Sequence, residues 1–208
     1  GTPSNRRNRP AKTGFGTESE LFVVPQDIQG THGTCTGEIF PTTEKIPKCE
    51  EITEYSINLF NGFIQNENIV YDIKCKVTEV SFDSKKCEKP VFLTSNEEKY
   101  TIFNINEEGK IYVFYDKIEK IDEEFWNEEI KINENARFME KKIWDNLKTG
   151  YSWRVKRTMG QPAVVNLYYG YLAIAIAVLT EGILYSDDGA WDYECFPIEG
   201  KAFEKEYL

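Results

Sequence analysis

The longest apolar run of this chain extends from Ala163 to Leu179 and contains no charged side chain. As an α-helix, a run of this length measures about 25 Å, which is shorter than the ~30 Å hydrocarbon core of a bilayer. A helix that is apolar on every side must be covered by other elements. We therefore predict that residues 162–180 form a buried helix at the centre of a globular core. Small residues on one side of this helix allow another element to approach closely: Asn166, Gly170, Ala173 and Ala177.

The segments before this helix show the two-residue alternation that is typical of strands. It is clearest in Ile69–Val80, where Tyr71, Ile73, Cys75 and Val77 share one face. Further strands are expected over Glu20–Val24, Ser56–Ile64, Pro90–Thr94, Lys99–Ile105 and Lys110–Ile118. Asn106–Gly109 predicts a hairpin loop between the last two strands, and the Gly- and Pro-rich residues 26–50 predict a loop.

Helical spacing returns after these strands. Ala136, Met139, Ile143 and Leu147 recur three or four residues apart, which predicts an amphipathic helix over residues 133–148. Shorter elements are predicted around it: a helix over Asp122–Glu129, a strand or an exposed connector over Tyr151–Arg157, a strand over Ile183–Tyr185 and a closing helix over Glu199–Leu208.

This order of elements favours an α+β fold. We expect a mostly antiparallel sheet that packs against two main helices, at about 133–148 and 162–180. Residues 17–208 are predicted to form a single α+β domain, and residues 1–16 a mobile basic arm in front of it.

Charge is divided unevenly along the chain. The net charge is −10, and because residues 1–16 hold four basic side chains and no acid, residues 17–208 carry −14. Nucleic-acid binding requires a basic surface, so we expect no nucleic-acid partner, and the short apolar run predicts no membrane span. A strongly acidic body is suited to a basic protein partner, with plain solubility as the alternative reason for its charge.

The residue types that support catalysis are scarce. His32 is the only histidine, and it lies near Cys35 in a Gly- and Thr-rich stretch that does not hold two side chains together. The five cysteines include no C-x-x-C pair, which favours a reduced, cytoplasmic protein, although a single Cys35–Cys49 disulfide is an alternative. We predict no catalytic residue, no metal ion and no cofactor.

The C-terminal part combines acidic with aromatic side chains. Trp and Tyr are common interface anchors, and carboxylates around them attract a basic partner. The acidic stretch over residues 122–129 has the same character. The predicted partner-binding residues are Asp187, Asp188, Trp191, Asp192, Tyr193 and Glu194, together with Glu123, Glu124 and Glu128.

Two other interpretations of the C-terminal residues stay open. In the first, Trp191 is buried in the core beside an edge strand and a turn, and the acids around it are only solvated. In the second, paired carboxylates serve a glycosidase-like hydrolase that acts on a polar substrate.

Three short stretches carry a resemblance to known proteins: Gln161–Ala163, Thr180–Ile183 and Ser186–Asp192. With the apolar helix between them, they resemble the C-terminal part of small bacterial proteins, some of which are similar to immunity proteins of polymorphic or contact-dependent toxin systems. The resemblance covers about 50 residues. It implies a non-enzymatic inhibitor that occludes a toxin. Together with the charge, it leads us to expect an acidic protein that neutralises a basic protein partner, in the first place a bacterial toxin.

Overall fold

The computed structural model describes residues 34–81, 99–186, 191 and 193–207. Seven strands within these ranges form one antiparallel sheet in the order β2-β3-β4-β5-β1-β6-β7. The strands are β1 (Thr34–Phe40), β2 (Cys75–Ser81), β3 (Lys99–Ile105), β4 (Gly109–Lys117), β5 (Tyr151–Thr158), β6 (Ile183–Tyr185) and β7 (Ile198–Glu199). The helices are α1 (Cys49–Asn66), α2 (Lys120–Ile132), α3 (Glu134–Phe138), α4 (Glu140–Leu147), α5 (Ala163–Leu179), α6 (Gly200–Tyr207) and the short 3-10 helix η2 (Tyr193–Cys195). The predicted α+β class is confirmed.

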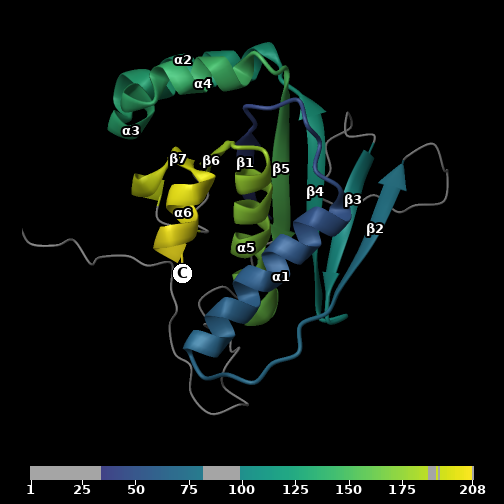
Figure 1. Cartoon of the computed structure of the whole chain (residues 1–208). Helices are drawn as coiled ribbons and strands as arrows, with labels where there is room; N and C mark the ends of the chain where they lie inside the picture. Colours follow the sequence, from purple (N-terminus) through teal and green to yellow (C-terminus); the bar gives the residue numbers. More distant parts are fainter. Residues whose placement is uncertain (1–33, 82–98, 187–190, 192, 208) are drawn as a thin grey trace, which may run out of the picture.

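Helix α5 lies at the centre of the core, as its uniform apolar character predicts. In Figure 1 it stands against the sheet, with α1 crossing in front of it and α6 beside it. Two residues of the predicted small-residue stripe meet α6. A methyl group on Gly170 would overlap the ring of Tyr207, and Gly200 of α6 rests on the α5 backbone at Ala177 and Val178. The stripe therefore lets α6 pack closely on α5.

Helix α1 forms the outer layer over α5, so the strand predicted over Ser56–Ile64 is wrong. The buried residues of α1 recur with helical spacing over a longer window: Ile52, Ser56, Leu59, Phe60, Phe63 and Ile64. Phe60 and Phe63 pack against Tyr171, each with its ring centroid 6.3 Å from that of the tyrosine. The Glu51 carboxylate accepts a hydrogen bond from the Lys48 backbone N–H (2.9 Å), which stabilises the start of the helix.

Strand β1 was not predicted, because residues 26–50 were expected to form a loop. It lies inside the sheet and pairs with β5 on one side and β6 on the other. Gly37, whose presence suggested a loop, leaves space on the sheet for the ring of Trp191. A Cβ atom at this position would lie 3.1 Å from that ring.

The helix predicted over 133–148 is instead two helices, α3 and α4, which are separated at Met139. With α2 they lie across one end of the sheet, as Figure 1 shows, and α1 takes the place expected for the second sheet-covering helix. Trp126 of α2 anchors this layer, with its ring centroid 5.3 Å from Phe40 and 5.4 Å from Tyr185. A fully buried aromatic cluster thus fixes α2 at the sheet end.

Several shorter predictions are confirmed. β3 and β4 form the expected hairpin, Ile183–Tyr185 is a strand, and residues 120–132 and 200–207 are helical. Tyr151–Thr158 forms a strand inside the sheet, so the alternative of an exposed connector is wrong. The strand predicted from Ile69 begins only at Cys75. Glu20–Val24, Pro90–Thr94, His32 and the arm over 1–16 lie outside the described residues. In the described ranges, no helix combines the length and apolar composition that crossing a bilayer requires.

Candidate functional site

Trp191 belongs to the core, so the prediction that its ring anchors a partner is wrong. Its side chain is only 6% exposed, and its ring stacks on Tyr169 with centroids 4.8 Å apart and planes within 12°. Phe196 and Phe203 close the other sides, at 5.9 and 5.6 Å. The burial of Trp191 beside the last strands is the part of the alternative interpretation that the structure bears out.

The acidic neighbours of Trp191 are described only in part. Asp187, Asp188, Asp192 and the side chain of Tyr193 lie outside the described residues, so their predicted roles, in binding or in hydrolysis, stay predictions. Glu194 is exposed on η2. The Asn135 side chain of α3 donates a hydrogen bond to the Glu194 backbone carbonyl (2.8 Å). Glu194 therefore lies beside α3, the helix that follows α2, and α2 carries Glu123, Glu124 and Glu128.

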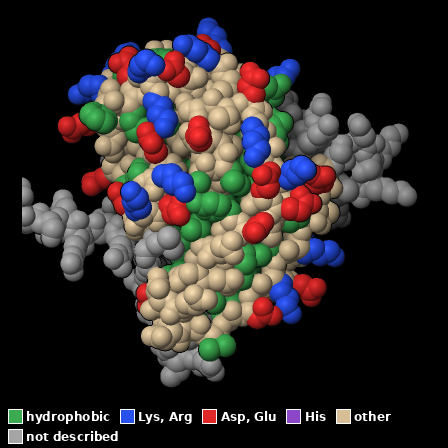
Figure 2. Space-filling model, in the orientation of Figure 1, with side chains coloured by type: hydrophobic (Ala, Val, Ile, Leu, Met, Phe, Trp, Pro, Cys, Tyr) green, Lys and Arg blue, Asp and Glu red, His purple; other side chains and the backbone are tan. Residues whose placement is uncertain are grey.

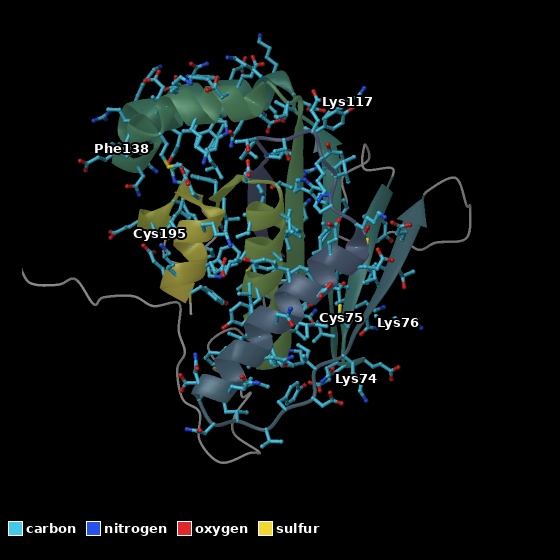
Figure 3. All side chains as sticks on the ribbon, in the orientation of Figure 1. Lys74, Cys75, Lys76, Lys117, Phe138 and Cys195 are labelled. Atoms are coloured by element: carbon cyan, nitrogen blue, oxygen red, sulfur yellow. The ribbon has the colours of Figure 1, made fainter. Side chains whose placement is uncertain are left out.

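The outer side of α2 and α3 exposes several large apolar side chains. Ile121, Ile132 and Phe138 are 67%, 78% and 92% exposed. Figure 3 labels Phe138 at the outer end of this helical layer. We call the surface formed by Ile121, Glu124, Glu128, Ile132 and Phe138 the α2–α3 ridge.

Helical geometry explains why the ridge combines these residue types. Positions 121, 124, 128 and 132 are three or four residues apart and share one face of α2, roughly opposite the buried Trp126. Glu123 is also exposed but lies off this face. Because Trp126 packs the opposite face of α2 into the core, Ile121, Glu124, Glu128 and Ile132 face away from it.

The ridge carboxylates make only weak interactions with the rest of the chain. Glu124 pairs with Lys120 at 3.3 Å and Glu128 with Lys131 at 2.7 Å, and all four side chains are more than half exposed. Pairs of this kind contribute about 0–1 kcal/mol, so a stronger basic group of a partner can replace the lysines. Residues 120–138 contain six acidic and three basic side chains, which Figure 2 shows intermixed over the helical layer.

The acidic half of the ridge was predicted from the sequence, and the apolar half was missed. Ile121, Ile132 and Phe138 look like core residues in a hydrophobicity pattern. A signal was present, however, since Ile121 and Ile132 are eleven residues apart and share a helix face with Glu124 and Glu128. An isoleucine pair on the acidic face of a helix whose other face carries a tryptophan is the pattern that could have revealed it.

A second surface feature is a groove of about 530 Å³ between α1 and β2. Cys49 and Cys75 lie in its lining and are both free thiols, so the alternative Cys35–Cys49 disulfide is not formed. Burial raises the pKa of the Cys75 thiol to about 11. Burial also raises the pKa of Cys49, and the charges of Glu79 and Glu50 add to this rise. Both thiols are therefore protonated at neutral pH and are poor nucleophiles.

This protonation is testable by alkylation. At pH 8, we expect iodoacetamide to modify Cys75 about a hundredfold more slowly than a free cysteine, because only a small fraction of the thiol is ionised. The rate should rise about tenfold per pH unit up to pH 10, as measured by mass spectrometry of the digested protein. The same protein unfolded in urea provides the reference rate. Fast modification at pH 8 with a plateau near pH 9 would show a solvated thiol and contradict the buried position.

Nothing in the described ranges groups three or more His, Cys, Asp or Glu side chains closely enough to hold a metal ion. The resemblance of the C-terminal stretches to immunity proteins stays a prediction. The chain matches no family model, no curated protein sequence and no solved structure.

Proposed function

We propose that this protein is a non-enzymatic, acidic binding protein that neutralises a basic protein partner, and that the partner is a bacterial toxin. The observation that carries the proposal is the α2–α3 ridge, on which three exposed apolar side chains flank two exposed carboxylates. Exposed apolar groups with a charged surround are typical of protein-binding surfaces. The free thiols Cys49 and Cys75 support action in a reducing compartment, the cytoplasm.

The two kinds of ridge residue have different roles in this proposal. Ile121, Ile132 and Phe138 provide affinity, since complete burial of a side chain of this size is worth about 1.5–3 kcal/mol. Glu124 and Glu128 accelerate the encounter with a basic surface and select against acidic proteins. Ridge charge should therefore affect the association rate, and ridge apolar residues the dissociation rate.

The test uses the full chain and the product of the reading frame immediately upstream of its gene. We expect this product to arrest growth when expressed alone, and co-expression of the chain to restore growth. In surface plasmon resonance, Glu124→Lys/Glu128→Lys should slow association at least about tenfold at low salt. Phe138→Ala should accelerate dissociation about tenfold, in line with an anchor worth more than 1 kcal/mol.

Glu67→Lys/Glu107→Lys serves as the matched control, because it makes the same charge change at two exposed positions distant from the ridge. It should change association far less than the ridge variant. Equal effects of the two double variants would show that only net charge matters and would remove the ridge from the proposal. A non-toxic upstream product, or one that does not bind the chain, would overturn the proposed function itself.

A further inference from the structure

The groove between α1 and β2 has the features of a binding surface that is independent of the ridge. Helix α1 contributes Glu50, Thr53, Glu54 and Ile57 to its lining, and β2 contributes Cys75 and Val77. In Figure 2, hydrophobic side chains reach the surface in the middle of the face that α1 crosses, with charged side chains around them. Figure 3 shows Cys75 facing α1, whereas Lys74 and Lys76 point away from it.

Strand β2 is an edge strand, since the sheet order begins with it and no other described strand pairs with its outer side. The hydrogen-bonding direction follows from its first pairing. The Lys74 carbonyl accepts a hydrogen bond from the Asn106 N–H at 2.9 Å, so even-numbered residues of β2 bond toward β3. The N–H and C=O groups of Cys75, Val77 and Glu79 therefore point outward. Because no described strand pairs with them, these groups form a template for a further strand.

The groove is acidic as well as apolar. Its lining includes Glu50 and Glu54 but no Lys or Arg, and Glu79 lies next to it, 3.8 Å from the Cys49 sulfur. Within the described part of the chain, none of these three carboxylates forms a salt bridge. Glu50 stabilises the helix dipole in the first turn of α1. Glu54 lies beyond that turn and Glu79 on a strand, so the dipole does not explain them.

The lining of the groove also includes a buried polar atom that makes no hydrogen bond among the described residues. Thr53 Oγ1 is buried and has no hydrogen-bond partner among the described residues. A buried hydroxyl left in this state costs free energy that a bound donor or acceptor would recover. The groove thus combines apolar side chains, carboxylates, the open edge of β2 and a buried hydroxyl without a hydrogen bond.

We propose that the α1–β2 groove is a docking site for an extended segment of another protein that carries Lys or Arg at alternate positions and adds to β2 as an antiparallel strand. Main-chain hydrogen bonds to Cys75, Val77 and Glu79 hold the segment, as in other cases of strand addition. Directly paired residues of antiparallel strands have side chains on the same face, so the residues bonded to β2 point their side chains into the groove. Their aliphatic stems cover Ile57 and Val77 while their charged ends reach Glu50 and Glu54.

The probe for this site is a blocked octapeptide of four Arg-Thr repeats, titrated against the full chain by calorimetry at low salt. We expect Glu50→Gln/Glu54→Gln to weaken its binding at least about tenfold, which is 1.4 kcal/mol or more. Glu67→Gln/Glu107→Gln, with the same charge change elsewhere, should leave the affinity within about twofold. Hydrogen exchange of the amides of Cys75, Val77 and Glu79 should slow in the complex.

Two methylated peptides separate strand addition from simple charge attraction. N-methylation of the four Arg residues removes the N–H groups that would bond to β2 and should abolish binding. N-methylation of the four Thr residues removes only outward N–H groups and should preserve it. Equal loss with both peptides, equal loss with both double variants, or no binding at millimolar peptide would each overturn the inference. None of these outcomes bears on the ridge, whose residues are unchanged in every variant.

Discussion

Replacement of Trp191 by alanine is expected to lower the free energy of unfolding by about 3–5 kcal/mol, the usual cost of removing a large buried aromatic side chain. The ring stacks on Tyr169, rests on Gly37 and contacts Phe196 and Phe203, so its loss leaves a cavity between α5, β1 and α6. Urea denaturation monitored by far-ultraviolet circular dichroism measures the change.

Phe138→Ala is the matched control for this variant. Phe138 is also a large aromatic residue, but it is 92% exposed, so its removal should change the free energy of unfolding by no more than about 0.5 kcal/mol. Comparison of the two variants thus distinguishes an aromatic side chain that stabilises the fold from one that is proposed to bind the partner. A Trp191→Ala protein that keeps its stability but loses its partner would restore the original interpretation of Trp191 as an exposed anchor.

Gly200→Val is expected to destabilise the protein by about 1–3 kcal/mol, because overpacking forces neighbouring elements apart. A Cβ atom at Gly200 would lie 2.7 Å from the carbonyl carbon of Ala177 and from the nitrogen of Val178. These are backbone atoms of α5, which cannot rotate away as a side chain can. The variant should melt at a lower temperature, and α6 amides should exchange faster because the helix no longer packs closely on α5.

Gly62→Ala, in contrast, should raise the free energy of unfolding. Gly62 lies inside α1, and a Cβ atom there would have no neighbour within 4 Å. Alanine reduces the entropy that the backbone loses in a helix interior, which is worth about 0.5–1 kcal/mol. A stabilising effect of Gly200→Val, or a destabilising effect of Gly62→Ala, would contradict the packing that the structure describes around α5 and along α1.

Whether an element was predicted correctly depended on how many consecutive residues its pattern needs to become visible. The segment Ser56–Ile64 is apolar enough to resemble a strand, and only the wider span from Ile52 to Ile64 shows the helical period of α1. The hairpin of β3 and β4 needed no wider span, because alternation and a loop of polar residues ending in Gly109 are local signals. Strand β1 had no local signal, since Gly37 lies in its middle.

The candidate surfaces, too, were predicted where the signal is local and missed where it depends on the tertiary structure. Charge counts are visible in a sequence, so Glu124 and Glu128 of the ridge were predicted. The exposure of a side chain is not visible in a sequence. An isoleucine or a phenylalanine has the same hydrophobicity whether it lies on the buried face or on the exposed face of a helix. For the same reason Trp191 was expected on the surface, although Tyr169 and Gly37 form a place for it in the core.

The sequence alone determined the features that depend on neighbouring residues: the buried helix α5, the stripe of small residues on it, the hairpin and the acidic character of the body. Only the tertiary structure decided the features that depend on residues far apart in the chain. These are the insertion of β1 between β5 and β6, the burial of Trp191 and the juxtaposition of α1 with the edge of β2. The physical reason is that hydrophobic period and charge act over a few residues, whereas strand pairing and burial are set by whichever distant segment completes the core.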